Sequence, residues 1–190
     1  TTHRAAYVLG LVMSLEGSAA WAQAGESCAD ANQQAEQIKD RCYALAGTPG
    51  MSTEALADMQ ETCAVEALEP LLHRCDTPWI RFSLGGAEAN RGRWVRAWTL
   101  MDAARRTPDP LVEEAVRQGN ALERARAHVV LVAPRSEGGA ASLEVNGARV
   151  GTLPLTVPVA VEPGRVRVRV TRAGCRLWER AGTFAGGDEM

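Results

Sequence analysis

The sequence has few aromatic residues, almost no lysine and no surplus of basic charge. Aromatic residues fill 5% of the 190 positions, and Lys39 is the only lysine. The 21 lysine and arginine residues face 23 aspartate and glutamate residues, which leaves a formal net charge of −2. Electrostatic binding to nucleic acid requires a clustered excess of basic residues, so the composition excludes a partner of that kind.

Long apolar runs are also lacking. A helix that spans a bilayer needs about 20 consecutive apolar residues, and nothing after residue 24 is both that long and that apolar. We therefore expect no transmembrane helix in the mature chain.

Patterns typical of enzymes are missing as well. The sequence contains no arrangement of a nucleophile with its base, no paired carboxylate motif, no phosphate-binding loop and no closely spaced metal ligands. His128 lies in a strand-like run, where we expect it to pack in the core. The expected protein is not an enzyme, and it uses no cofactor and no metal.

Residues 1–24 have the pattern of a secretory signal peptide. A weakly basic start precedes an apolar run over residues 5–13, and Ala22-Gln23-Ala24 is a small-x-small cleavage motif. The alternative interpretation is a buried amphipathic helix. We predict cleavage after Ala24 and an extracytoplasmic location, in a periplasm or at a cell surface.

Four cysteines, Cys28, Cys42, Cys63 and Cys75, lie in the same part of the chain. In an exported protein such a cluster predicts disulfides, and four cysteines allow three pairings. A zinc site that includes His73 is the alternative. It is disfavoured because the cysteine spacings lack a closely spaced pair.

Helical patterns surround these cysteines. One helix is expected over residues 27–46, opened by a capping-box-like pattern, and a second from residue 52 or 53 towards residue 68. The breaker cluster Gly47-Thr48-Pro49-Gly50 separates them. The sequence therefore predicts a helical hairpin over residues 25–76.

This hairpin selects one disulfide pairing. Cys28 and Cys42 would lie about 21 Å apart on one helix, whereas bridged Cα atoms lie within about 7 Å. The pairs Cys42–Cys63 and Cys28–Cys75 are both centred on the turn, as an antiparallel hairpin requires, and the crossed pairs are not. Nested bridges are the prediction.

Residues 77–127 are also expected to be helical. Asp76-Thr77-Pro78 is a helix start, and Thr107-Pro108-Asp109-Pro110 ends one helix and begins another over residues 111–127. Between these signals, small and large residues recur in a fixed order: Leu84, Gly85, Gly92, Trp94, Ala97, Met101 and Ala104.

This order resembles a tetratricopeptide repeat over residues 78–111. The resemblance implies two antiparallel helices that approach closely, stack on their neighbours and contribute to a surface for a partner protein. The sequence departs from the family at Arg81 and Glu88, which stand at positions for large aromatic residues. A plain helical bundle without a peptide groove is the alternative.

The composition becomes strand-like after residue 127. Asn146-Gly147 is a strong hairpin signal between two short alternating segments. Residues 166–170 alternate strictly between valine and arginine, which predicts one buried and one solvated face.

The strand-like segments together resemble a PEGA domain, a small β-sandwich of bacterial and archaeal envelope proteins. The matching stretches are residues 143–147, 150–155, 161–164 and 166–174, with Glu162-Pro163-Gly164-Arg165 in place of the name-giving tetrapeptide. The resemblance implies a β-sandwich over residues 128–185. It also implies a role in attaching the protein to, or displaying it on, a cell surface.

Two features of this module have alternative interpretations. Arg165, Arg167 and Arg169 are candidates for contact with an anionic cell-wall or surface polymer, or they form a solvated face that discourages edge pairing. Cys175 stands where the family often has an aromatic residue, so we expect it to be buried. Residues 186–190 are expected to be a frayed end.

The expected fold is α+β, with an N-terminal helical part followed by a small C-terminal β-sandwich. We expect a non-enzymatic envelope or cell-surface protein whose helical part binds a partner protein, with Trp98 and Arg105 as candidate contact residues. The alternative is a structural spacer without a specific ligand. A groove predicts exposed apolar residues beside Trp98, whereas a spacer predicts that Trp79, Trp94 and Trp98 are all buried.

Overall fold

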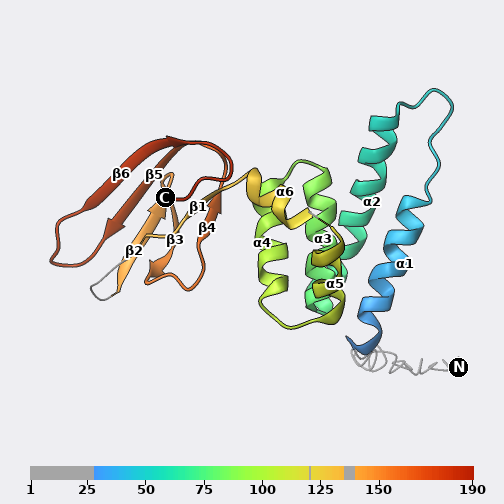
Figure 1. The fold of residues 1–190 in the computed structure, drawn as a ribbon, viewed down its shortest axis with the longest axis horizontal. Coiled ribbons are helices and arrows are strands. Elements are labelled where there is room, and N and C mark those ends of the chain that lie inside the picture. The colour runs from blue at the N-terminus through green and yellow to red at the C-terminus, as the bar shows by residue number, and fades with distance from the viewer. Residues whose placement is uncertain (1–27, 120, 135–139) are drawn as a thin grey trace, which may run out of the picture.

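The computed structural model describes residues 28–119, 121–134 and 140–190, so the predicted signal peptide and its cleavage site lie outside the described residues. In the described part, helices come first and antiparallel sheets follow (Figure 1). This order confirms the predicted α+β fold.

The first two helices form the expected hairpin. A short 3₁₀ turn, η2 (Cys28–Asp30), leads into α1 (Ala31–Tyr43), and α2 follows (Thr53–Arg74). Ser52 caps α2, because its hydroxyl accepts a hydrogen bond from the backbone N–H of Ala55 at 3.1 Å. The helix extends beyond the predicted end near residue 68, since Leu68 and Leu71 on its last turns are buried in the core.

The next two helices are α3 (Pro78–Asn90) and α4 (Trp94–Arg105). Thr77 caps α3 with its side chain, and Pro78 occupies the first helical position, as the sequence predicts. Gly85 lies where α3 approaches α4 closely: a Cβ atom there would come within 2.6 Å of Cγ of Met101. The small residue is therefore what allows the two helices to approach.

The single helix expected over residues 111–127 is wrong. The structure has two helices instead, α5 (Pro110–Gln118) and α6 (Ala121–Ala127). Asp109 caps α5 by accepting from the N–H groups of Leu111 and Val112. Gly119 ends α5 in an extended conformation, because glycine stabilises a helix interior poorly.

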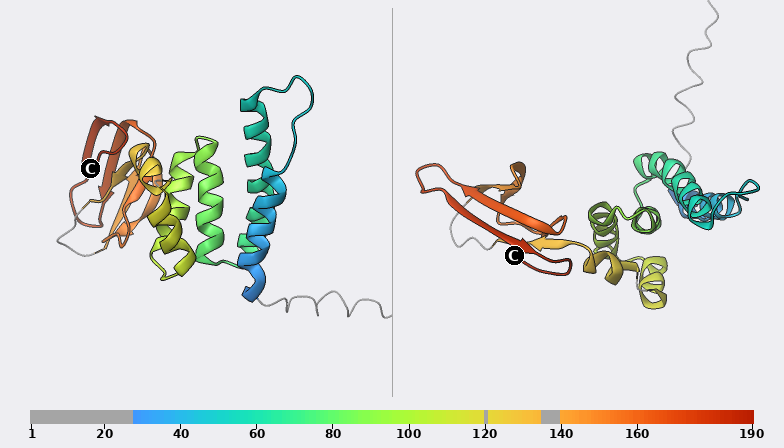
Figure 2. Two further views of the ribbon diagram at one scale, coloured as in Figure 1. Left: turned by 45° about the vertical axis from the view of Figure 1, so that its right-hand side comes forward. Right: turned by 90° about the horizontal axis from the view of Figure 1, so that it is seen from above.

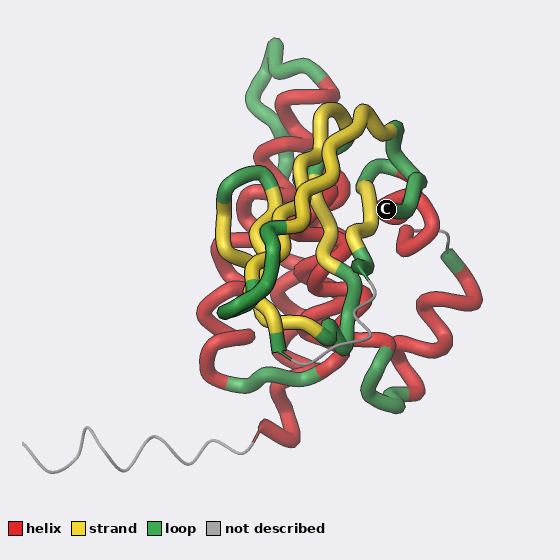
Figure 3. Tube along the Cα trace, turned by 90° about the vertical axis from the view of Figure 1, so that its left-hand side faces the viewer, coloured by secondary structure: helices red, strands yellow, loops and turns green. Residues whose placement is uncertain are grey.

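The C-terminal part contains two antiparallel sheets (Figure 3). One pairs β1 (Val130–Val132) with β4 (Val159–Val161). The other has the order β3-β2-β5-β6, from strands β2 (Ala141–Val145), β3 (Ala148–Leu153), β5 (Gly164–Thr171) and β6 (Trp178–Phe184). Asn146 and Gly147 both have positive φ angles (51° and 84°), which is the geometry of the two-residue hairpin that they predict.

The last residues of the chain pair with β1, so the expectation of a frayed end is wrong. The N–H of Leu131 donates to the carbonyl of Asp188 at 3.0 Å, and the N–H of Met190 donates to the carbonyl of Leu131 at 2.8 Å. These bonds satisfy backbone groups on the free side of a short strand, which is why the segment is ordered there.

Three apolar clusters follow one another in chain order. The elements around them lie in the same order in the two further views, with the α1–α2 hairpin at one end, α3 to α6 in the middle and the sheets at the other end (Figure 2). The first lies between α1, α2 and α3, and the second between α3, α4, α5 and α6. The third lies between the two sheets, and its buried members include Val132, Leu143, Val166 and Val168. Leu131 and Ala160, from β1 and β4, belong to the second cluster, so the sheets and the helices share apolar packing at their junction.

Candidate functional site

The four clustered cysteines form the predicted nested bridges. Cys28 is bonded to Cys75 and Cys42 to Cys63, with Cα–Cα distances of 5.5 Å and 5.6 Å. The inner bridge lies near the turn of the hairpin and the outer bridge at its open end. The pairing derived from the hairpin geometry is confirmed.

A part-buried polar contact, between the buried Glu61 and the partly exposed Tyr43, supports the same hairpin. The Tyr43 hydroxyl donates to Oε2 of Glu61 at 2.8 Å, and the Asn90 amide donates to Oε1 at 2.8 Å. Burial raises the pKa of Tyr43 well above its usual range, and the hydrogen bond to Glu61 and the charge of that carboxylate raise it further. The phenol therefore remains a protonated donor, and the group links α1, α2 and α3.

Trp98, the first candidate for partner binding, is buried at 7% exposure. The guanidinium carbons of Arg105 and Arg126 lie 5.7 Å and 6.0 Å from its ring centroid, so these two side chains cover it. Arg105 is exposed but also forms an ion pair with Asp102 at 2.7 Å. The expectation of Trp98 as a surface contact is wrong, because long arginine side chains from two helices close over it.

The other two tryptophans are half-buried and also have partners. The Trp79 indole donates to Oε1 of Glu36 at 2.7 Å. The Trp94 ring stacks on His128, with centroids 4.0 Å apart. His128 is exposed after the end of α6, so the expectation that it packs in the core is wrong.

Arg165, Arg167 and Arg169 lie together on the outer face of the four-stranded sheet, as the alternation predicts. They line a cavity of about 420 Å³ with Glu144, Asn146 and Gly147. Carboxylates reach two of the arginines: Glu179 lies 3.6 Å from Arg167, and Arg169 lies 3.2 Å from Glu179 and 3.7 Å from Glu144. Only Arg165 lacks an ion pair with a described residue, so the face carries mixed charge rather than a purely basic surface.

Cys175 is exposed and unpaired, which contradicts the expectation of burial. It lies in the turn between β5 and β6, where its N–H donates to the carbonyl of Arg172 at 3.1 Å. Gly174 before it has a positive φ of 73°, a conformation that glycine adopts readily in a turn. The thiol therefore lies in an exposed turn and is not part of the buried valine face.

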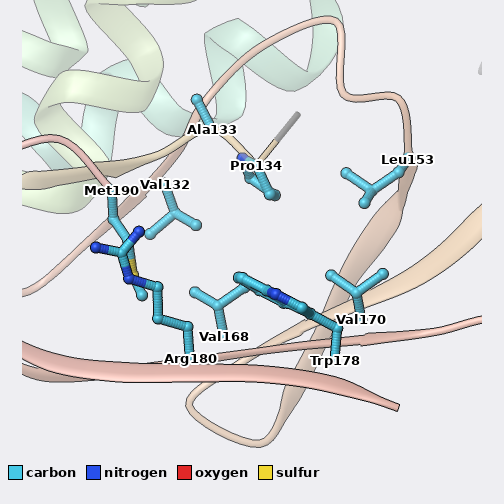
Figure 4. A pocket seen from close by; sticks show the side chains of 9 residues that line it. All are labelled: Val132, Ala133, Pro134, Leu153, Val168, Val170, Trp178, Arg180 and Met190. Carbon is cyan, nitrogen blue, oxygen red and sulfur yellow. The ribbon is translucent and has the colours of Figure 1, made fainter. Parts of the chain in front are cut away.

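An apolar cavity of about 390 Å³ between the two sheets was missed by the sequence reasoning (Figure 4). Its walls come from β1 and the residues that follow it, from β3, β5 and β6, and from the C-terminal segment: Val132, Ala133, Pro134, Leu153, Val168, Val170, Trp178, Arg180 and Met190. In Figure 4 the Trp178 ring lies beside Val168 and Val170, and Arg180 extends towards Met190. The one sequence signal for this cavity was that Trp178 and Arg180 lie two residues apart, which places both on one face of a strand. Met190 was not expected at a cavity, because residues 186–190 were expected to be frayed and instead pair with β1.

No group of three or more histidine, cysteine, aspartate or glutamate side chains in the described part of the chain is arranged to hold a metal ion. No helix among these residues has the length and apolar character needed to cross a membrane.

Comparison with known proteins assigns no family. The chain matches no protein-family model, no curated protein and no solved structure. Any functional conclusion must therefore come from the geometry described above.

Proposed function

We propose that the protein is an exported, non-enzymatic scaffold of a cell envelope, in which a disulfide-braced row of helices holds a small β-sandwich in a fixed orientation. The shared apolar cluster at the junction is the observation that carries this proposal. Leu131 of β1 and Ala160 of β4 pack with helices α3 to α6, and Trp94 of α4 stacks on His128 beside them. Apolar surface buried between two modules resists their independent motion.

The tryptophan environments meet the spacer criterion at Trp98 only. Trp98 is buried, and Trp79 and Trp94 are half-buried with polar or stacked partners. The disulfides suit an oxidising compartment, which agrees with an extracytoplasmic location.

The two family resemblances belong to this proposal. The close approach of α3 and α4 at Gly85 supports the tetratricopeptide likeness of residues 78–111. The buried Val166 and Val168 in an antiparallel sheet support the PEGA likeness of the C-terminal module, whose proposed role is to attach or display the protein at the surface.

Nuclear magnetic relaxation of the backbone tests the scaffold. In the full chain, amides of α2 and β5 should report one common rotational correlation time. Combining Trp94→Ala with Leu131→Ala should separate the two values, whereas Tyr43→Ala, far from the junction, should not. If β5 already tumbles faster than α2 in the native protein, the modules are independent and the scaffold proposal is wrong.

Export needs its own test. The protein recovered from the periplasm or the cell surface should begin at Gly25 when its N-terminal sequence is determined. Retention of the whole chain in the cytoplasm, with Cys28 and Cys75 reduced, would contradict the proposed location.

A partner protein held by the helical part is the second candidate, and one observation favours it. Tyr43, Leu45 and Met51 at the tip of the first hairpin are 36–40% exposed, and apolar side chains gathered at a tip can form a contact surface. Pull-down from envelope extracts should then lose a protein when Leu45 and Met51 are changed to aspartate. The same change at the exposed Leu111 of α5 serves as the control. Equal capture by both variants would remove this candidate.

A further inference from the structure

The cavity between the two sheets combines an apolar wall with one cationic side chain. Val132, Leu153, Val168, Val170 and Met190 supply aliphatic or thioether surface, and Trp178 adds an aromatic ring that is 47% exposed. Because Trp178 and Arg180 are both exposed, the cavity opens to solvent on the β6 side. Its volume of about 390 Å³ lies within the about 300–1,000 Å³ typical of small-molecule sites.

Arg180 is the charged group at this cavity. Arg180 and Trp178 are the cross-strand partners of Val168 and Val170. The four side chains therefore share the inner face of the sheet, which lines the cavity. Arg167 and Arg169 of the same sheet face outward and have carboxylate partners, and Arg165 faces outward without one. Arg180 forms no ion pair with any residue in the described ranges. A guanidinium without a carboxylate partner among the described residues, placed beside an apolar wall, is complementary to a carboxylate attached to an apolar body.

Two kinds of ligand combine a carboxylate with an apolar body: a peptide with a free C-terminus and a fatty acid. The polarity of the cavity wall distinguishes between them. A peptide with a C-terminal carboxylate would bring amide groups into the cavity, and each would need a hydrogen-bond partner there. Among the side chains that line the cavity, only Arg180 and the Trp178 indole have polar hydrogen-bonding groups. An acyl chain has no amide groups to satisfy, so the wall suits it better.

We propose that this cavity binds a free fatty acid of medium length, with the acyl chain against Val168, Val170 and Trp178 and the carboxylate on Arg180. The site is independent of the proposed scaffold role, because none of these residues belongs to the junction with the helices.

Calorimetric titration of the full chain with sodium decanoate, below its micelle concentration, tests the proposal. Decanoate should bind with a single site per chain. Decanol and decyltrimethylammonium, which have the same chain length, should bind at least about tenfold more weakly, since a hydrogen bond to a charged group accounts for a difference of that size.

Variants then locate the site. Arg180→Gln should weaken decanoate binding about tenfold and leave decanol binding unchanged. Trp178→Ala should weaken both ligands, because it removes part of the wall. The matched control is Arg165→Gln on the opposite face of the same sheet, which should change neither. Circular dichroism of each variant establishes that the sheets remain folded.

Several results would overturn the proposal. Absence of decanoate binding, equal binding of decanoate and decanol, or equal effects of Arg180→Gln and Arg165→Gln would each do so. Binding of an apolar peptide with a free C-terminus in place of decanoate would assign the cavity to a peptide instead.

Discussion

Glu88 is a fully buried carboxylate in the middle of the helical part. Arg96 Nε lies 3.1 Å from its Oε1 and Arg93 Nη1 lies 3.6 Å from its Oε2, yet neither oxygen accepts a well-aligned hydrogen bond from a described residue. Both arginines are about half exposed, and Arg96 also contacts Glu69 at 2.5 Å. Glu88 is therefore the buried partner, whereas the two arginines that face it reach solvent.

This asymmetry predicts unequal effects for the two partners. Arg96→Met leaves Glu88 buried with only the more distant Arg93, so it should cost about 3 kcal/mol of unfolding free energy. Glu88→Met removes the buried charge and leaves arginines that solvent can reach, so stability should change by no more than about 1 kcal/mol. Urea denaturation measures both values.

The control for the arginine change is Arg117→Met in α5, because Arg117 forms an exposed pair with Glu114. Such pairs contribute about 0–1 kcal/mol, so its effect should be small. A larger loss for Glu88→Met than for Arg96→Met would mean that the carboxylate stabilises the helices despite its burial.

Cys175 differs from the other four cysteines in being exposed and free. We expect iodoacetamide to label one thiol per chain in the native, unreduced protein, and Cys175→Ser to abolish the labelling. In an oxidising compartment the same thiol should form a disulfide with a second molecule or carry a cap. Mass spectrometry of the labelled protein measures this, and a native chain that resists labelling without any cap would contradict the exposed position.

At the scale of elements, the contact between α3 and α4 depends on one of two neighbouring glycines. A Cβ atom on Gly85 would meet Cγ of Met101 at 2.6 Å and the carbonyl oxygen of Ala97 at 3.1 Å. A Cβ atom on Gly86 would meet nothing within 4 Å. The two positions therefore form a matched pair within one helix.

Gly85→Ala should destabilise the protein by about 1–3 kcal/mol, since the added methyl group overpacks the contact with a backbone atom on one side. Gly86→Ala should stabilise it by up to about 1 kcal/mol, because alanine favours the helix and the space is open. Thermal unfolding of both variants decides the matter. Equal shifts in Tm would show that helix propensity alone acts at these positions.

At the scale of the whole molecule, the apolar clusters differ in whether disulfides or apolar packing stabilise them. The α1 side of the first cluster consists of Ala31, Ala35 and Cys42, which bury little apolar area, with Ile38 partly buried against it. The two disulfides therefore have to supply much of the attachment of α1. The β-sandwich core contains Leu143, Val166 and Val168 and is far from any of the bridges.

Replacing all four bridged cysteines with serine should therefore release α1 first. Loops of 47 and 21 residues correspond to about 4 and about 3 kcal/mol in the chain-entropy account of disulfides. Hydrogen exchange should become fast in residues 31–43 while residues 141–145 and 164–171 keep their protection. Simultaneous loss of protection in all of these segments would instead indicate a single cooperative unit.

The sequence alone determined the features that depend on near neighbours in the chain. Ser52 and Thr77 cap their helices as expected, because a cap involves residues only two or three positions away. The turn at Asn146-Gly147 follows from the same kind of local preference. The disulfide pairing was also predictable, since a hairpin of two helices permits only one nested arrangement of the four cysteines.

Only the tertiary structure decided which side chains are covered. Trp98 is buried because Arg105 and Arg126 converge on it from different helices, and Cys175 is exposed in the turn that follows β5. The cavity beside Arg180 exists because the last residues of the chain return to β1. Burial is a property of segments that meet from distant parts of the chain, and the periodicity of one segment does not specify its partner.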